Sequence, residues 1–288
     1  TPIKACNQGA VKGHLMSTHD STINRDSQAY WNKRARTFTR NATGDYERWL
    51  LDLLALEAGD EVLDMGCATG TLAVPLARAG HRVHGCDFAE AMLAILDERA
   101  AAENLPIISR LLAWEDDWEA AGLGEDSVDT AFASRSLMSG NVFSAVHKLD
   151  SAARSRAAVV VPGSLLPSRD PRLLTYLGRS ARRARIVHDV TRALTSLGRI
   201  PAFATTRTFR PMRFSSFDEA RSDLRRLAGP EPFTVREQRL FDAYAAQHFM
   251  RETATGASGE SDDQWILDYK LPVTWVFIGW RTDGRAWA

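Results

Sequence analysis

Short apolar runs alternate with segments of helical periodicity over about residues 45–162. Residues 62–65 are apolar apart from one acid and do not alternate, which is typical of a strand covered on both faces. Leu72, Leu76 and Ala79 then recur at helical spacing. The same succession repeats, with strands expected at 82–86, 107–112, 127–134 and 157–161 and helices at 89–102 and 142–154. Repeated strand and helix units predict a parallel sheet with helices on both faces.

Further elements are expected on either side of this repeat. Before it, residues 27–38 carry aromatic and small residues at helical spacing, and residues 45–56 have the pattern of an amphipathic helix. After it, the pattern predicts a helix at about 171–197, a strand at 201–209, helices at 215–227 and 234–251, a Gly/Ser/acid loop at 253–263, and strands at 265–270 and 273–281 separated at Pro272. We expect the helices between the last strands to cap the strand ends.

An acid and two glycines follow the first strand in the order Asp64-Met65-Gly66-Cys67-Ala68-Thr69-Gly70. The glycines suit a tight turn where the backbone approaches a ligand. The dinucleotide fingerprint G-x-G-x-x-G is absent, because position 68 is alanine and position 69 is threonine. Asp64 would repel a pyrophosphate and therefore favours a cationic ligand group. Asp87 ends the second strand about 20 residues further on, where an acid suits a ribose hydroxyl.

Residues 64–70 resemble the first motif of the class I S-adenosylmethionine-dependent methyltransferases, a strand ending in Asp or Glu followed by G-x-G-x-G. With Asp87 at the matching distance, the resemblance covers about residues 45–162. It implies S-adenosylmethionine as the cofactor, with Asp64 near its methionine amino end and Asp87 accepting both ribose hydroxyls. The resemblance further implies cofactor contacts from Gly66, Cys67, Ala68 and Gly70, with Phe88 and Met92 flanking the adenine.

Two positions depart from the family's pattern. Ala68 replaces the middle glycine, and we expect its methyl group to be tolerated because φ stays negative there. After the third strand, Ala113 stands where the usual adenine-binding acid would be, so Glu115 and the backbone around Trp114 are the expected substitutes. In an alternative interpretation that needs no ligand, the glycines only turn the chain and Asp87 only caps the following helix.

The outer end of the fourth strand and the first helix supply the remaining pocket candidates. Ligands bind outside the carboxyl ends of parallel strands, so we assign Ser134 to the cofactor and Arg135 and Ser136 to the substrate pocket. Tyr30 and Trp31 resemble the Tyr-Trp helix that folds over the cofactor in many small-molecule methyltransferases; alternatively, they only pack the helix on the core. No catalytic residue is assigned, because a sulfonium methyl is already activated and mainly needs an aligned nucleophile.

Composition limits the remaining choices. The chain has 288 residues, of which 36 are basic and 36 acidic, so no global field favours nucleic acid or a membrane. No apolar run approaches a membrane span and no signal peptide is visible, which favours the cytoplasm. The three cysteines lack C-x-x-C spacing and no His is paired with a carboxylate at ligand spacing, so no metal site is expected. We interpret residues 1–26 as a leader that is disordered or foreign to the natural protein.

Arginine is concentrated in residues 169–226, which hold fourteen Arg, no Lys and five acids, a local formal charge of +9. One interpretation is a patch for an anionic substrate or for RNA phosphates. The other is a solvated helix face neutralised by the acidic loop at 115–129. We favour the second.

Together with the resemblance, these patterns predict an α/β fold: a Rossmann-like, doubly wound, seven-stranded and mostly parallel sheet with an antiparallel last strand beside the fifth. Residues 27–162 would form the lid helices and the cofactor-binding core, and residues 163–288 the helical cap and the remaining strands of the same domain. The expected function is S-adenosylmethionine-dependent methyl transfer to a small molecule by a monomer or homodimer. The alternatives are methylation of an RNA and a binding module that keeps the cofactor pocket without turnover.

Overall fold

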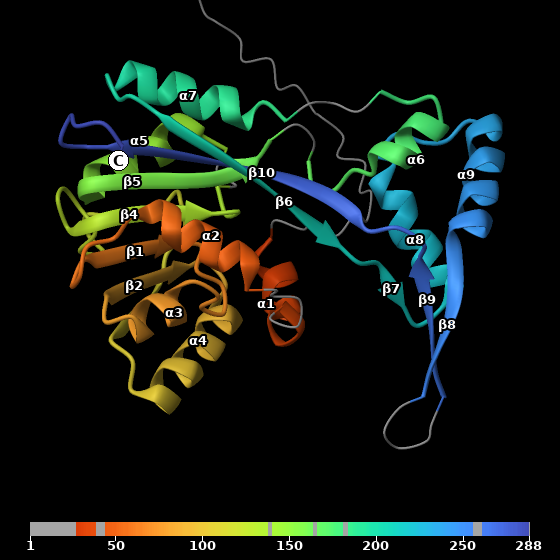
Figure 1. The fold of residues 1–288 in the computed structure, drawn as a ribbon, viewed down its shortest axis with the longest axis horizontal. Coiled ribbons are helices and arrows are strands. Elements are labelled where there is room, and N and C mark those ends of the chain that lie inside the picture. The colour runs from red at the N-terminus through yellow and green to blue at the C-terminus, as the bar shows by residue number, and fades with distance from the viewer. Residues whose placement is uncertain are drawn as a thin grey trace, which may run out of the picture.

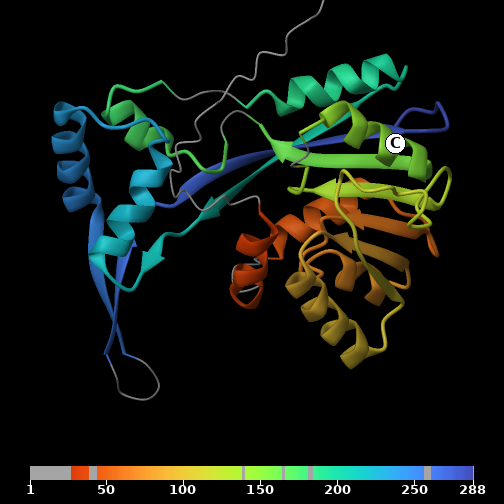
Figure 2. The same cartoon turned by 180° about the vertical axis from the view of Figure 1, so that it is seen from behind.

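The computed structural model describes residues 27–38, 44–137, 140–163, 166–180, 184–255 and 261–287. Figures 1 and 2 show two lobes side by side, joined by the long strands β6 (Ala202–Arg210) and β10 (Leu271–Arg281). The larger lobe is built on a seven-stranded sheet, and the smaller one contains a three-stranded sheet. The leader predicted at residues 1–26 lies outside the described residues.

The seven strands of the larger lobe follow the order β3-β2-β1-β4-β5-β10-β6. Its parallel strands are β1 (Glu61–Met65), β2 (Arg82–Asp87), β3 (Ile107–Leu111), β4 (Val128–Ser134) and β5 (Ala153–Pro162). β10 runs antiparallel between β5 and β6, so the last strand lies beside the fifth as predicted. The strand order reverses between β1 and β4, and open α/β sheets bind their ligands at the carboxyl edge of this switch point. The predicted Rossmann-like fold is confirmed.

Helices cover both faces of this sheet. α2 (Asp45–Leu54), α3 (Ala73–Arg78) and α4 (Glu90–Glu103) pack on one face, and α5 (Val142–Ala152) and α7 (Ile186–Ser196) on the other. Val159 and Val161 of β5 belong to the core under α5 and α7, whereas Ala158 and Val160 belong to the core under α2, α3 and α4. A strand buried on both faces needs apolar residues at every position, which explains the absence of alternation in the sequence.

The smaller lobe has a hydrophobic core of its own. Its antiparallel sheet has the order β7-β9-β8, formed by β7 (Arg213–Phe214), β9 (Ser261–Leu267) and β8 (Phe249–Thr255). The helices of this lobe are α6 (Pro171–Tyr176), α8 (Phe217–Leu227) and α9 (Val235–His248). Leu173, Leu224 and Phe241, one from each helix, are buried in its core. The segment that the sequence suggested as a cap therefore packs around its own hydrophobic cluster, which includes Leu271 of β10.

Arg179 ties the smaller lobe together. Its Nε donates to Glu237 Oε1 at 2.6 Å, and its terminal nitrogens donate to the carbonyls of Ala228, Glu231 and Pro232. The guanidinium also lies 4.7 Å from the centre of the Phe233 ring. One side chain therefore joins the end of α6 to the loop between α8 and α9.

Three element predictions for the second half are wrong. Pro272, which was expected to separate the last two strands, lies inside β10, and the break comes before it at residues 268–270. The single helix expected at 171–197 is interrupted, because Gly178 follows α6 in the left-handed conformation with φ at 72° and α7 begins only at Ile186. The loop expected at 253–263 is partly strand, since β8 reaches Thr255 and β9 starts at Ser261. These strands pair with each other, and that pairing extends into the stretch whose Gly, Ser and acidic residues suggested a loop.

The expected neutralisation of the arginine-rich segment by the loop at 115–129 is also not what the structure shows. Arg199 pairs with Asp150, Arg221 with Asp242 and Arg213 with Glu252, and Arg179 pairs with Glu237. The partner acids come from α5, α9 and β8. Part of the charge that looks unbalanced along the sequence is therefore balanced in space by acids from other segments.

Candidate functional site

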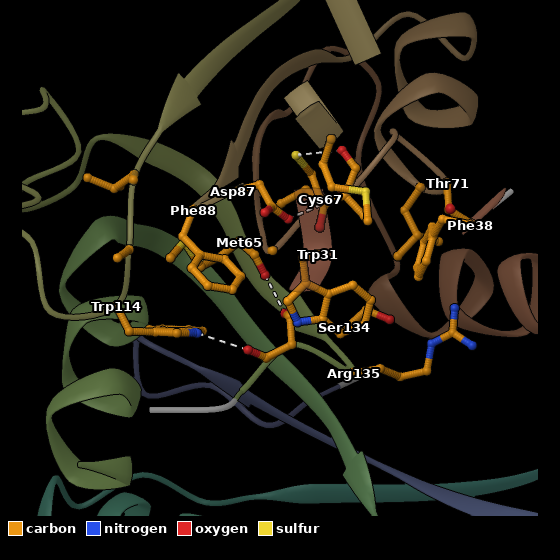
Figure 3. A pocket seen from close by; sticks show the side chains of 18 of the residues that line it. Trp31, Phe38, Met65, Cys67, Thr71, Asp87, Phe88, Trp114, Ser134 and Arg135 are labelled. Carbon is orange, nitrogen blue, oxygen red and sulfur yellow. Dashed lines mark hydrogen bonds between the residues drawn. The ribbon is translucent and has the colours of Figure 1, made fainter. Parts of the chain in front are cut away.

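A pocket opens at the carboxyl edge of β1, β2 and β4, next to α1 (Gln28–Phe38), and is shown in Figure 3. Its empty space is about 1070 Å³, including the part open to solvent at the mouth. The described lining residues are Trp31, Phe38, Asp64, Met65, Gly66, Cys67, Ala68, Thr71, Leu72, Asp87, Phe88, Met92, Leu112, Ala113, Trp114, Glu115, Ser134, Arg135 and Ser136.

The floor of the pocket is the turn between β1 and α3. The N–H groups of Gly66 and Cys67 both donate to Cys86 O, at 2.7 and 3.0 Å, so the turn is held against the end of β2. Gly66 and Gly70 adopt φ values of 80° and 82°, which L side chains rarely adopt. A Cβ on Gly70 would also come within 2.4 Å of Leu96 in α4. Both glycines are therefore required by conformation and by packing.

Ala68 also has a positive φ, at 48°, so the expectation of a negative φ at this position is wrong. Its N–H donates to Asp87 Oδ2 at 2.9 Å. The left-handed conformation costs a residue with a Cβ about 1–2 kcal/mol. The bond to Asp87 helps to hold the turn in a shape that glycine would adopt without strain.

Asp64 lies at the inner end of the pocket with a side chain that the protein satisfies only in part. The residue is 1% exposed, its Oδ2 has no hydrogen-bond partner among the described residues, and the Ala73 backbone donates to the carboxylate. Burial and the nearby Asp87 carboxylate raise the pKa of Asp64 to about 8. A buried acid with an unpaired oxygen is matched by a cationic partner, such as an ammonium group.

Asp87, at the end of β2, organises the neighbouring backbone. It accepts the N–H of Ala68 on Oδ2 and the N–H of Ala89 on Oδ1, both at 2.9 Å. Burial raises its pKa, although hydrogen bonds from Ala89, Ala68 and Phe88 act in the opposite direction. Each carboxylate oxygen can accept more than one hydrogen bond, so Asp87 can hold the turn and still accept from a ligand hydroxyl.

One end of the pocket is built around Trp114. Its indole N–H donates to Ser136 O at 2.9 Å, and its ring stacks on Trp118 at 5.4 Å between centroids. Lys148 Nζ donates to Trp114 O at 2.8 Å. Asp116 Oδ2 accepts the Ala113 N–H, so that donor is already engaged. The loop after β3 is therefore fixed by α5 and by the end of β4.

Helix α1 closes one side of the pocket. Trp31 and Phe38 line it and pack edge-on, with ring centroids 5.8 Å apart. Asn32 Oδ1 accepts the N–H of Ala91 at 3.0 Å, and Gln28 donates to Phe88 O at 2.7 Å. α1 is therefore attached to the start of α4 by polar contacts, and Figure 3 shows Trp31 projecting into the pocket between Phe88 and Arg135.

Across from Trp114, the end of β4 meets α2. Tyr46 and Ser134 share a hydrogen bond of 2.6 Å between their hydroxyl oxygens. The Arg135 guanidinium lies 4.1 Å from the centre of the Tyr46 ring. Burial raises the pKa of Tyr46 to about 12, so its hydroxyl stays protonated at neutral pH.

Comparison with known proteins adds to this geometry. A family model described as a methyltransferase domain matches residues 62–163, which run from β1 to just past β5 and carry most of the pocket. Over these residues the chain is similar to a methyltransferase domain.

Relatives of the methyltransferase domain are found among curated proteins and solved structures. The chain is 30% identical to an uncharacterized protein of Haemophilus influenzae over 130 residues, 44% of this chain and 47% of that protein. It is 32% identical to glycine N-methyltransferase of Rattus norvegicus over 138 residues, 44% of this chain and 46% of that protein. It thus spans about half the length of these relatives. The structure of a candidate methyltransferase of Bacillus halodurans shares the fold, with a TM-score of 0.52 and 16% identity over 83% of this chain and 99% of that one.

The structure gathers most of the residues that the sequence suggested into this one pocket of the methyltransferase domain. The exceptions are Gly70, which packs against Leu96 behind the turn, and Tyr30, which packs edge-on to Trp31 without lining the pocket. Sequence reasoning missed the lining residues Phe38, Met65, Thr71, Leu72, Leu112 and Ala113. Phe38 shares the aromatic face of α1, whereas the others are apolar or small residues that looked like ordinary core.

The described part of the chain was searched for metal-binding clusters and for membrane-spanning helices. Its His, Cys, Asp and Glu side chains form no group of three or more that could hold a metal ion. None of its helices is long and apolar enough to cross a bilayer.

Proposed function

We propose that the protein is an S-adenosylmethionine-dependent methyltransferase that acts on a small molecule. The observation that carries the proposal is the pair of buried carboxylates on adjoining strands, Asp64 with an unpaired oxygen and Asp87 beside it, in the pocket of the methyltransferase domain. A ligand with an ammonium group at one end and a ribose further along would satisfy both.

The residues of the pocket suit such a cofactor. Asp64 would receive the ammonium group of the methionine moiety, and Asp87 would accept from the ribose hydroxyls. Phe88 and Met92 supply apolar surface for a purine ring, and Figure 3 shows Trp114 at the same side of the pocket as Phe88. Glu115 also lines the pocket. The turn at Gly66 allows the backbone to approach the ligand closely, because glycine has no side chain to keep it away.

Catalysis by this chain would rest on positioning. When bound, the cofactor supplies a methyl group on a sulfonium, which a nucleophile can attack without further activation. Trp31 and Phe38 would exclude water from the inner pocket. The ends of β4 and α1 would orient the acceptor, and such alignment contributes a large part of catalysis when a group is transferred between two bound molecules.

We favour a small molecule over RNA as the acceptor because the arginines of residues 169–226 are largely engaged in the protein. Several are in ion pairs, and Arg225 stacks on Phe233 at 3.7 Å and donates to the carbonyls of Gly229 and Glu231. A cytoplasmic location is also proposed, supported by the buried free thiols of Cys67 and Cys86. Steeply salt-dependent RNA binding would contradict the choice of a small molecule as acceptor. Cell fractionation tests the cytoplasmic location.

Calorimetric titration with S-adenosylmethionine, S-adenosylhomocysteine and NAD tests the proposed function. We expect micromolar binding of the first two and none of NAD. Asp87→Asn should weaken binding of S-adenosylhomocysteine by about 1.5–3 kcal/mol, the contribution of hydrogen bonds to a charged acceptor. Asp97→Asn, which removes an exposed acid from α4, is the matched control and should bind like the wild type. Equal S-adenosylhomocysteine affinity of the two variants would show that Asp87 does not contact the cofactor.

A further inference from the structure

Arg135 is the only Lys, Arg or His among the described residues that line the pocket. It directly follows Ser134, the last residue of β4, and it is exposed, whereas Asp64 and Asp87 are buried at 1% and 6% exposure. Figure 3 shows Arg135 at the side of the pocket away from Trp114 and Phe88. A single cation therefore stands at the rim of a pocket whose other charged residues are acids.

The guanidinium of Arg135 rests on aromatic rings. It lies 4.1 Å from the centre of the Tyr46 ring and 5.6 Å from that of Trp275 in β10. Within the described ranges, its side chain forms no ion pair and no hydrogen bond, unlike Arg179, Arg199 and Arg221. Stacking uses the faces of a guanidinium and leaves the N–H donors at its edge available.

The backbone at Arg135 is held in a conformation that is unfavourable for arginine. Its φ is 60°, in the left-handed region, and its N–H donates to Val160 O at 2.9 Å on β5. Strained residues of this kind gather at functional sites. In this conformation the backbone no longer continues β4, and the Arg135 side chain lines the pocket.

We propose that Arg135 binds an anionic group, a carboxylate or a phosphate, of the methyl acceptor. A planar guanidinium pairs with either group through two parallel hydrogen bonds, and the rings beneath it fix its plane before the acceptor arrives. The inference rests on the proposed function and names the acceptor's class. It also fits the charge of the reaction, since the cationic sulfonium of a bound cofactor would attract an anionic acceptor.

The cofactor itself carries a carboxylate, which is a second source of the same chemistry. We assign Arg135 to the acceptor because the two acids that would hold the cofactor are buried, whereas Arg135 is at the exposed rim where an acceptor enters. The two sources are separated by measuring the affinity for the cofactor product in an Arg135 variant.

The test compares the wild type with Arg135→Met, which keeps the apolar stem and the Cβ but removes the charge. Arg192→Met is the matched control, because Arg192 also stacks on an aromatic ring, 5.5 Å from the centre of Phe143, but lies outside the pocket. Each protein is saturated with S-adenosylhomocysteine and titrated with acetate, inorganic phosphate and neutral acetamide. The reporter is the NMR signal of the Trp275 indole N–H, which donates to Thr208 Oγ1 at 2.9 Å.

We expect saturable binding of acetate or phosphate to the wild type and to Arg192→Met, at least tenfold weaker binding to Arg135→Met, and no binding of acetamide. Tighter binding of acetate would identify the acceptor's group as a carboxylate, and tighter binding of phosphate would identify it as a phosphate. Equal anion binding to the wild type and Arg135→Met, or no anion binding to any of them, would overturn the proposal. A tenfold or greater loss of S-adenosylhomocysteine affinity in Arg135→Met would assign the guanidinium to the cofactor instead. If the wild type does not bind S-adenosylhomocysteine, the proposed function fails, and the anion titration of the ligand-free protein still decides whether Arg135 is an anion site.

Discussion

The Ser136 side chain occupies the place that a side chain on Gly66 would need. A Cβ built on Gly66 would lie 2.1 Å from Ser136 Cβ and 2.5 Å from its Oγ. Ser136 is itself fixed, because its hydroxyl donates to Met65 O and its carbonyl accepts the Trp114 indole N–H. The segment after β4 is thus hydrogen-bonded to the end of β1 through Ser136 and to the loop after β3 through Trp114.

Gly66→Ala should therefore be costly to folding. The positive φ costs alanine about 1–2 kcal/mol, and the overlap with Ser136 costs about 1–3 kcal/mol more. Gly122→Ala separates the two effects, because Gly122 has a similar φ of 75° but no atom within 4 Å of an added Cβ. Urea denaturation should show the smaller loss at Gly122. Equal losses for the two variants would mean that Ser136 moves aside freely.

Ala68→Gly should stabilise the protein slightly. Relief of the left-handed strain gains about 1–2 kcal/mol, and the greater freedom of glycine in the unfolded chain removes about 0.5–1 kcal/mol of that gain. The hydrogen bond to Asp87 uses the backbone and is kept. Urea denaturation measures the change. A net loss of stability would show that the methyl group has favourable contacts that outweigh the strain.

Cofactor binding should depend on the ionisation of Asp64. Its pKa is raised from the ordinary value of 3.8 to about 8, first by burial and then by Asp87, so the ligand-free protein holds a proton there at neutral pH. An ammonium group binds the ionised form, so S-adenosylhomocysteine affinity should rise by up to about tenfold per pH unit until about pH 8. Calorimetry in buffers of different ionisation enthalpy should show up to one proton released per molecule bound at pH 7.

The same pKa shift predicts the stability of the ligand-free protein. The folded state keeps the Asp64 proton that the unfolded chain loses near pH 4, so this contribution to stability is present below that pH and is lost as the pH rises toward about 8. Asp64→Asn should flatten both pH dependences while leaving the fold intact. A variant that binds S-adenosylhomocysteine with the wild-type pH profile would show that another group titrates.

Arg179→Met should destabilise the smaller lobe without affecting the pocket. The substitution removes the contacts to Glu237 and to three carbonyls, which should lower the melting temperature by about 5 °C. Arg48→Met is the control, because Arg48 pairs with Asp45 in the open, with side chains 77% and 81% exposed. S-adenosylhomocysteine affinity should stay unchanged in both. A loss of affinity in Arg179→Met would mean that the smaller lobe shapes the cofactor pocket.

The first half of the chain was predictable because its signals are local. A strand buried on both faces is apolar at every position, and a tight turn requires glycine, so β1, β2 and the turn at Gly66 could be placed from the sequence. Asp87 could be assigned by its distance from the turn. The conformation of Ala68 could not, because its positive φ depends on a hydrogen bond to Asp87, nineteen residues away.

The second half was harder because its structure depends on long-range pairing. Helical periodicity continued through residues 171–197, although Gly178 interrupts it, and the short strands β7, β8 and β9 have no strong pattern of their own. The arginines looked unbalanced because their partners, among them Asp150 and Glu237, lie outside the segment. The stacking of Arg135 on the Tyr46 and Trp275 rings could not be predicted either, since these two residues are separated by most of the chain.

The shared strand β10 has a mechanical consequence. One end of it pairs with β5 in the larger lobe and the other reaches the smaller lobe, and Trp275 lies between them beside Arg135. From Trp275 to Gly279 the strand is paired on both sides, with β5 and with β6, and a strand held in this way bends little. Any rotation of the smaller lobe would therefore tilt the Trp275 ring and, with it, the angle at which Arg135 meets an incoming molecule.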